Sequence, residues 1–235
     1  AAGFDGKKIT ISNKMSPGEI RKERLRYMPA QNKEYYLATI QHNNVFEGQM
    51  EKSALEAYYD FKSTYPDSGY VKYLEPEMAP LIAFFAGKGE LPKNADYVSD
   101  YEVLNSLEEL ITRFKGEKIY IDIWATWCGP CREEFKYKEE LYKLLKANNI
   151  TVIYISVDEE NRDEGWKKMI GYYGLQGHHL RTNKRFSAEL HNFFDGTGTI
   201  AIPWYILVGA DGKIASKHAA PPSDLEKLKK EINTL

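Results

Sequence analysis

The chain of 235 residues has only two cysteines, and they lie three positions apart in the segment Trp127-Cys128-Gly129-Pro130-Cys131. Two thiols at this spacing can close into a disulfide and open again. Such chemistry needs one sulfur that reacts as a thiolate and a second that completes the exchange. The segment therefore indicates a redox-active dithiol.

The residues on either side of the cysteines predict a strand followed by a helix. β-branched and aromatic residues fill 118–124, as in a buried strand, whereas 132–148 is rich in Glu, Lys and Leu with apolar residues on one helical face. We expect Cys128 at or just before a helix N-terminus, where unpaired N–H groups and the helix dipole favour a thiolate. Cys131 falls one turn into the helix, within reach of a mixed disulfide on Cys128 yet shielded from large partners.

The residues between and after the cysteines agree with this interpretation. Pro130 is tolerated in a first helical turn, because the N–H that it lacks would have no partner within the helix. Gly129 leaves the approach to Cys128 open. A zinc site needs about four ligands, and the sequence has neither a second CxxC nor a nearby HxxxH. Haem attachment needs His directly after the second cysteine, where the chain has Arg132.

The segment from Asp122 to Cys131 resembles the active-site segment of the thioredoxin superfamily, and the downstream pattern is similar to its exported TlpA/ResA-like branch. The resemblance covers about residues 96–235. It implies an α/β thioredoxin fold, with a central mixed sheet flanked by helices. We expect this domain to span 91–235 and a smaller α-helical region to span 1–90, since Gly and Pro cluster at 86–92 between two differently patterned regions.

Two carboxylates are candidates for acid and base chemistry beside the dithiol. Asp122 interrupts an apolar strand, and burial there would raise its pKa toward a useful range. By resemblance to thioredoxin, Asp122 relays a proton to or from Cys131; the alternative is a strand-end aspartate facing solvent. ResA-like proteins carry a glutamate at the position of Glu134, which also suits a solvated first helical turn. The division of labour between the two carboxylates stays open.

A second group of residues is expected to bind substrate. The superfamily has a cis proline facing the CxxC motif at the position of Pro203, so the resemblance implies a cis Ile202–Pro203 bond. The Ile202 backbone would then pair with an extended substrate segment, as in strand addition. Trp124 either shares an apolar docking surface with Trp127 or belongs to the core. The expected substrate-binding residues are Trp127, Gly129, Pro130, Ile202 and Pro203.

Further elements follow from periodicity and turn signals. In the N-terminal region we expect an extended segment around 8–11 and helices over 17–28, 33–41, 48–65 and 71–85. In the second domain we expect a strand or hairpin at 97–103, a helix at 106–114 capped by Ser106, a strand at 150–157, a helix at 162–173, strands at 204–208 and 213–217, and a closing helix at 223–235 capped by Ser223. The strand, helix, strand order predicts parallel pairing. The stretch from 174 to 202, with its three histidines, is assigned no catalytic role.

Composition narrows the function class. The net charge of −2 gives no reason to expect nucleic-acid binding, and no apolar run approaches the roughly 20 residues of a membrane-spanning helix. The chain begins without an initiator Met, which is compatible with a leader that has been removed. The resemblance implies export, to the periplasm or the cell envelope.

The leading prediction is a thiol-disulfide oxidoreductase acting on protein disulfides, in which Cys128 attacks and Cys131 resolves the mixed disulfide. No metal or organic cofactor is needed. The Gly-Pro pair between the cysteines resembles thioredoxin, which favours a reducing or isomerising role and an electron donor such as a membrane thiol carrier. Two alternatives stay open: a binding or scaffold protein that uses the helical region, and a thiol peroxidase, whose PxxxT/SxxC signature does not match Ile121 and Ala125.

Overall fold

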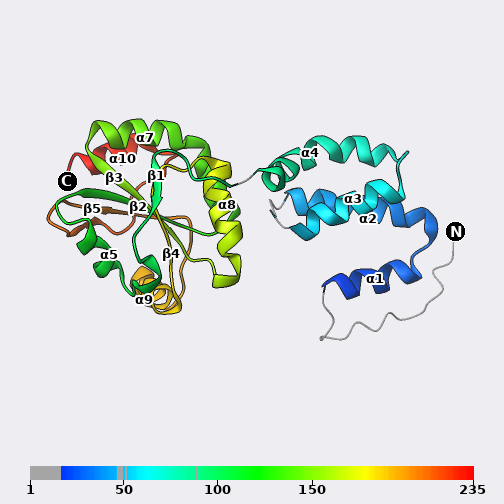
Figure 1. Cartoon of the computed structure of the whole chain (residues 1–235), viewed down its shortest axis with the longest axis horizontal. Helices are drawn as coiled ribbons and strands as arrows, with labels where there is room; N and C mark the ends of the chain where they lie inside the picture. The colour runs from blue at the N-terminus through cyan, green and yellow to red at the C-terminus, as the bar shows by residue number, and fades with distance from the viewer. Residues whose placement is uncertain (1–16, 47–49, 51, 88) are drawn as a thin grey trace. The chain divides into compact units, whose positions relative to one another are not determined.

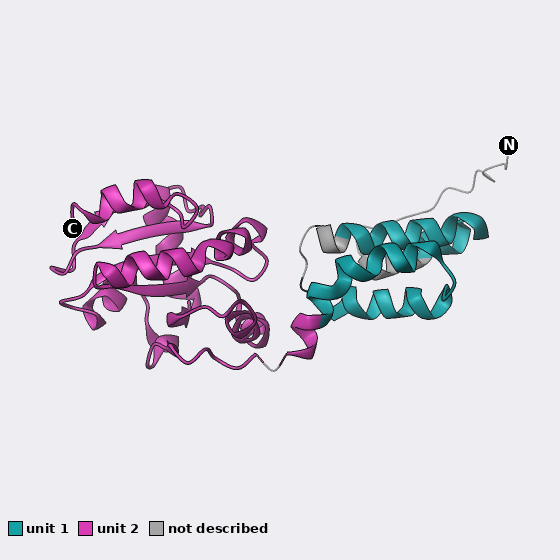
Figure 2. Cartoon of the chain, turned by 90° about the horizontal axis from the view of Figure 1, so that it is seen from above, with its two compact units in different colours: residues 1–82 teal, residues 83–235 magenta. Residues whose placement is uncertain are grey.

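The computed structural model describes residues 17–46, 50, 52–87 and 89–235. The chain divides into two compact units, residues 1–82 and 83–235 (Figure 2). The extended segment expected around 8–11 lies outside the described residues. The domain boundary that we propose near residue 90 follows the end of the last helix of the N-terminal region, at Ala86.

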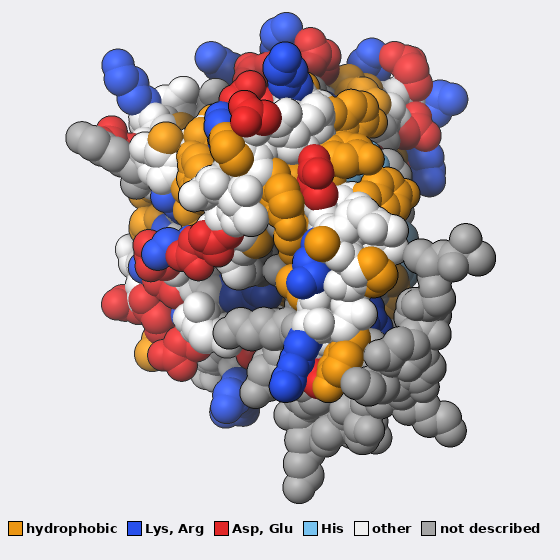
Figure 3. All heavy atoms as spheres, turned by 90° about the vertical axis from the view of Figure 1, so that its right-hand side faces the viewer, with side chains coloured by type: hydrophobic (Ala, Val, Ile, Leu, Met, Phe, Trp, Pro, Cys, Tyr) orange, Lys and Arg blue, Asp and Glu red, His pale blue; other side chains and the backbone are white. Residues whose placement is uncertain are grey.

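The first unit is built from helices, as the sequence predicts. Tyr58 and Phe61 from the third helix and Leu74, Met78 and Leu81 from the fourth are buried in its core. Several tyrosines of this unit are exposed instead, and Figure 3 shows hydrophobic side chains lying among charged ones on the face that it views. The helices are α1 (Pro17–Tyr27), α2 (Ala30–Phe46), α3 (Lys52–Thr64) and α4 (Gly69–Ala86), with Pro76 and Pro80 inside α4.

The second unit contains a six-stranded mixed sheet of order β1-β4-β3-β2-β5-β6 (Figure 1). β1, β4, β3 and β2 pair in parallel, which confirms the predicted pairing, while β5 runs antiparallel to both β2 and β6. The strands are β1 (Ala95–Tyr97), β2 (Lys118–Trp124), β3 (Ile150–Ser156), β4 (Gly177–Arg181), β5 (Trp204–Val208) and β6 (Ile214–Ser216).

Helices cover both faces of this sheet, with α7 and α10 on one side and α5 and α9 on the other (Figure 1). Leu141 and Leu145 from α7 and Leu228 from α10 pack with Tyr120 and Tyr205 from the sheet in one hydrophobic cluster. The helices are α5 (Leu107–Arg113), α6 (Gly129–Glu134), α7 (Lys138–Ala147), α8 (Asp163–Tyr173), α9 (Lys184–Asp195) and α10 (Leu225–Ile232). Among the described residues, no helix has the length and apolar character that crossing a membrane requires.

Three expectations about local structure were wrong in part. The helix expected over 132–148 is interrupted by a 3₁₀ turn at Phe135–Tyr137, where Phe135 is buried against Trp124. Of the strand or hairpin expected at 97–103, the structure has the end of a strand, β1, followed by a 3₁₀ turn and no hairpin. The stretch 174–202, for which the sequence analysis predicts no element, contains β4 and α9. The closing helix spans Leu225–Ile232 and its cap is Asp224 rather than the predicted Ser223, because the Asp224 side chain accepts a hydrogen bond from the backbone N–H of Lys227.

Candidate functional site

The two cysteines form a disulfide at the start of α6, with their Cα atoms 5.3 Å apart. Cys128 is the N-cap residue of α6, and its Sγ accepts a hydrogen bond from the backbone N–H of Cys131 at 3.1 Å. The backbone N–H of Cys128 donates to the carbonyl of Ala125 at 3.0 Å, which closes the turn between β2 and α6. This confirms the predicted position of Cys128 at the helix N-terminus, where helix N–H groups stabilise a thiolate.

The two sulfurs differ in access. Cys128 retains 4% of its surface and Cys131 none, while the adjoining Trp127 is 56% exposed. From the side of Trp127, Cys128 is therefore the accessible cysteine and Cys131 is shielded. This difference in access between the two cysteines is the asymmetry that stepwise thiol exchange requires.

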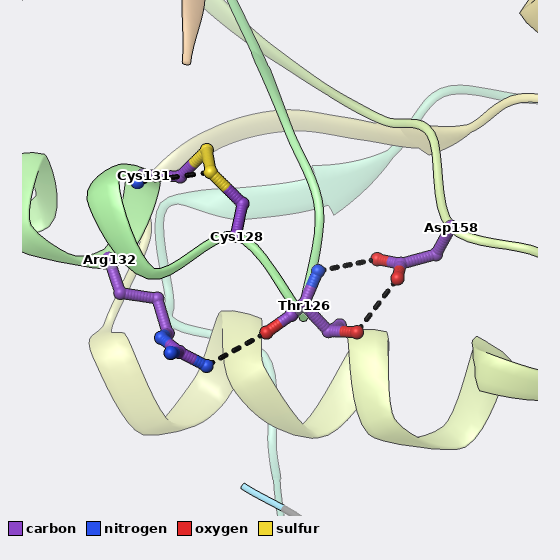
Figure 4. The surroundings of a disulfide bond; sticks show 5 residues. All are labelled: Thr126, Cys128, Cys131, Arg132 and Asp158. Carbon is purple, nitrogen blue, oxygen red and sulfur yellow. Dashed lines mark hydrogen bonds between the residues drawn. A yellow bond between two sulfur atoms is a disulfide. The ribbon is translucent and has the colours of Figure 1, made fainter. Parts of the chain in front are cut away.

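A buried aspartate that the sequence reasoning missed holds the loop in front of the dithiol (Figure 4). The Asp158 carboxylate accepts hydrogen bonds from the backbone N–H and the hydroxyl of Thr126, at 2.8 and 2.7 Å, and a third from the hydroxyl of Ser156 at 2.8 Å. Arg132 donates from Nη1 to the carbonyl of Thr126 at 2.9 Å. The loop is thus fixed from two sides. The available signal was an acidic residue just past the end of a buried strand.

Asp122 lies inside the protein, on β2. It is 1% exposed, so the alternative of a solvent-facing aspartate is wrong. Its neighbours in register are Tyr154 on β3 and Tyr205 on β5. Within the described part of the chain its Oδ1 has no hydrogen-bond partner. Burial, and next to it the charge of Glu134, raises the pKa of Asp122 well above its ordinary value.

The Ile202–Pro203 peptide bond is cis, as the resemblance implied. Trp204, the next residue, pairs with Ile123 near the end of β2. Because β2 leads directly into the dithiol loop, this register places Pro203 at the same end of the sheet as Cys128. Both Ile202 and Pro203 are half-buried, so part of each remains accessible from outside.

The comparison with protein families decides what kind of domain this is. The family model described as Redoxin matches residues 102–232, which is more than half of the chain. The chain belongs to the Redoxin family. This match confirms the expected thioredoxin-superfamily character and the α/β fold of the second unit. The α-helical first unit lies outside the matched residues.

Curated relatives agree with the Redoxin assignment. The thiol-disulfide oxidoreductase ResA of Bacillus thuringiensis subsp. konkukian is 30% identical over 121 residues, which are 51% of this chain and 65% of that protein. ResA of Bacillus subtilis is 31% identical over 78 residues, or 33% of this chain and 44% of that protein. The chain thus spans less than two thirds of these relatives. A solution structure of a thiol:disulfide interchange protein from Bacteroides sp. is 25% identical, with a TM-score of 0.42, over 54% of this chain and 78% of that one.

Glu134 in the Redoxin domain is held by the loop before α10 rather than left in solvent. Its two carboxylate oxygens accept hydrogen bonds from the hydroxyl and the backbone N–H of Ser223, both at 2.9 Å. Ser223, which the sequence predicted as a helix cap, therefore connects this loop to α6. From this fixed position the charge of Glu134 acts on Asp122.

Burial shows which aromatic and histidine side chains of the Redoxin domain belong to the core and which reach the surface. Trp124 is fully buried and packs edge-on against Phe135, with 5.2 Å between ring centroids, so it belongs to the core and Trp127 alone reaches the surface. His179 stacks on Tyr154 at 5.1 Å, and burial lowers its pKa to about 4. His179 is therefore a neutral part of the sheet face.

Proposed function

We propose that this protein is a thiol-disulfide oxidoreductase that exchanges its Cys128–Cys131 pair with disulfides of other proteins. The observation that carries the proposal is the pairing of a slightly exposed N-cap sulfur, Cys128, with a fully buried one, Cys131. Membership of the Redoxin family and similarity to proteins named ResA support it.

The exchange proceeds in two balanced steps. In the reduced protein, the Cys128 thiolate attacks a substrate disulfide; one S–S bond breaks, a mixed disulfide forms and one substrate sulfur leaves as a thiol after it takes up a proton. The Cys131 thiol then loses its proton and attacks Cys128. The substrate leaves with both sulfurs reduced, and the protein is left with the Cys128–Cys131 bond.

Asp122 is the group that we assign to the proton transfer of the second step. Its raised pKa lets it hold a proton at a pH where an ordinary aspartate has lost one, which suits an acid and base inside the protein. Glu134, hydrogen-bonded to Ser223, acts through its charge, because a negative group nearby favours the protonated form of Asp122. In this proposal Asp122 exchanges the proton and Glu134 adjusts its affinity.

Substrate binding is assigned to the surface around Cys128. Trp127 and Pro130 are exposed, and Gly129 is half-buried, so the three residues that flank Cys128 present a small apolar platform. The backbone of Ile202, next to the cis Pro203, is proposed to pair with an extended substrate strand. Backbone pairing would let the protein accept disulfides in different sequences.

We further propose a reducing or isomerising role outside the cytoplasm, in the periplasm or at the cell envelope. The Gly-Pro pair between the cysteines and the similarity to ResA support this direction. A reductant in such a compartment needs a supply of electrons, so a second thiol protein, such as a membrane thiol carrier, is the expected donor.

A redox titration of the Cys128–Cys131 couple tests the proposal. The couple is equilibrated in thiol/disulfide buffers and followed by tryptophan fluorescence. A midpoint below about −220 mV is expected of a reductant, and one above about −150 mV would instead mark an oxidant. In parallel, Cys131→Ser should trap mixed disulfides with a model protein disulfide, whereas the matched Cys128→Ser variant should trap none. Absence of an intramolecular disulfide at every poise would refute the exchange mechanism.

A further inference from the structure

A row of polar side chains crosses the sheet at the level of Asp122. The strand register places His179 on β4 opposite Tyr154 on β3, Tyr154 opposite Asp122 on β2, and Asp122 opposite Tyr205 on β5. Residues directly opposite each other in a sheet point to the same face. Tyr205 packs in the cluster formed with α7 and α10, so this row lies beneath those helices.

The phenols around Asp122 differ in their hydrogen bonding. The Tyr120 hydroxyl donates to the carbonyl of Ala220 at 2.9 Å, and the Tyr154 hydroxyl lies 2.9 Å from that of Tyr142. The Tyr205 hydroxyl is buried without a hydrogen-bond partner among the described residues.

Asp122 carries a hydrogen-bond acceptor that the Tyr205 phenol lacks. Its Oδ1 is also buried and unpartnered among the described residues, and it belongs to the residue directly opposite Tyr205. Buried polar groups left without partners cost free energy, so two of them on residues directly opposite each other in adjacent strands are candidates for bridging by one shared water.

We propose that Tyr205 is the positioning residue for Asp122: its phenol donates a hydrogen bond to one enclosed water, which in turn donates to the Asp122 carboxylate. This inference rests on the proposed function. When Cys131 becomes the attacking group, its S–H bond breaks and the proton moves to Asp122, which leaves a Cys131 thiolate and a neutral carboxyl. Tyr205 keeps its own proton throughout and stabilises the carboxylate that must be present before the transfer.

The surrounding charges explain why such a donor is needed. Burial and the charge of Glu134 both raise the pKa of Asp122, so the carboxylate form has little other support. Burial, followed by the charge of Asp122, raises the pKa of Tyr205, which keeps the phenol protonated as a donor. The titratable groups whose charges interact with that of Asp122 are Tyr120 on β2, Tyr154 on β3, Tyr205 on β5, Glu134 on α6 and Tyr142 on α7.

The test is the pKa of Asp122 in Tyr205→Phe, read from the ¹³C resonance of the labelled carboxyl and assigned with Asp122→Asn. We expect an upward shift of about one pH unit, which corresponds to about 1.4 kcal/mol, because the variant loses a donor to the charged form. At a pH below the pKa of Asp122 in both proteins, Tyr205→Phe should hold about tenfold less of Asp122 as the carboxylate than the unsubstituted protein does. The rate of the Cys131-dependent step should be about tenfold lower in the variant for that reason. The matched control is Tyr120→Phe, which removes a phenol already bonded to Ala220 and should leave the pKa of Asp122 nearly unchanged.

A measurement on the unsubstituted chain guards against misfolding of the variant. With ¹³Cζ-labelled tyrosine, the Tyr205 resonance should move as Asp122 titrates, and this movement should vanish in Asp122→Asn. An unchanged Asp122 pKa in folded Tyr205→Phe, or a Tyr205 resonance that ignores the titration, overturns the inference. Failure of the proposed function is distinguishable, since the unsubstituted protein would then reduce no protein disulfide whatever the state of Tyr205.

Discussion

Replacing Asp122 by Asn should change the pH dependence of stability of the second unit. Asp122 is 1% exposed, its Oδ1 has no hydrogen-bond partner among the described residues, and burial raises its pKa well above the ordinary value. An ionised carboxylate at this position opposes folding, because the unfolded chain solvates the charge and the folded protein does not. Asn keeps the shape of the side chain and removes the charge.

The sign follows from proton binding. Between the unfolded pKa, about 3.9, and the raised folded pKa, the folded state holds a proton that the unfolded state has released. Stability contributed by Asp122 is therefore fully present below the unfolded pKa and is lost as pH rises through this window. Inside the window the loss approaches about 1.4 kcal/mol per pH unit, and Asp122→Asn should remove it.

The assay is urea unfolding of the oxidised protein at pH 5, 6, 7 and 8. All four tryptophans, at 124, 127, 166 and 204, belong to residues 83–235, so their fluorescence reports on this unit and not on the helical one. This matters because a two-unit chain need not unfold in one step. The difference in unfolding free energy between the variant and the unsubstituted protein should grow with pH.

Asp211→Asn is the matched control. The Asp211 side chain is exposed and accepts a hydrogen bond from the backbone N–H of Lys213 at 3.0 Å, which together with the Lys213 side chain lowers the pKa of Asp211. The contribution of Asp211 is present above its unfolded pKa and is lost only in acid, so this variant should keep the decline in stability with rising pH that the unsubstituted protein shows. Parallel stability curves for Asp122→Asn and the unsubstituted protein would refute the reasoning.

Three further variants probe the packing around the site in the same urea assay. Asp158→Ala should lower the free energy of unfolding by about 3 kcal/mol, because it leaves the buried hydrogen-bond donors of Thr126 without an acceptor. An unchanged urea midpoint would contradict the role of Asp158 in holding this loop. Leu228→Ala should lower the free energy of unfolding by about 3 kcal/mol, because it leaves a cavity under α10. A decrease below about 1 kcal/mol would mean that the helix moves into the space. Gly177→Ala should be strongly destabilising, since its φ is +113° and a Cβ would lie 2.5 Å from Val152 Cγ1, so near-normal stability would argue against this register of β4.

Elements with strong local signals were predicted from the sequence. The Ser106 cap of α5 is one example, because its side chain accepts a hydrogen bond from the backbone of Glu109 as the capping-box spacing predicts. β2 and the N-cap position of Cys128 are others, since an apolar β-branched run and a CxxC segment at a strand end depend on neighbouring residues alone.

Elements that depend on contacts between distant parts of the chain were not predicted from the sequence. β4 is short and carries two histidines, and it becomes a strand because β1 and β3 pair with it on either side. The 3₁₀ turn at Phe135–Tyr137 likewise has no sequence signal of its own, since it accompanies the packing of Phe135 against Trp124.

The residue pattern was enough to predict a dithiol at a helix start, a carboxylate within the preceding strand and a proline just before a later strand. The folded chain was needed to learn that Asp122 is buried and lacks a partner for Oδ1 among the described residues, that Glu134 is held by Ser223, and that Tyr205 lies opposite Asp122. The physical reason is range. Caps, turns and spacing act over a few residues, whereas burial, strand register and electrostatic coupling bring together residues that lie far apart in the chain.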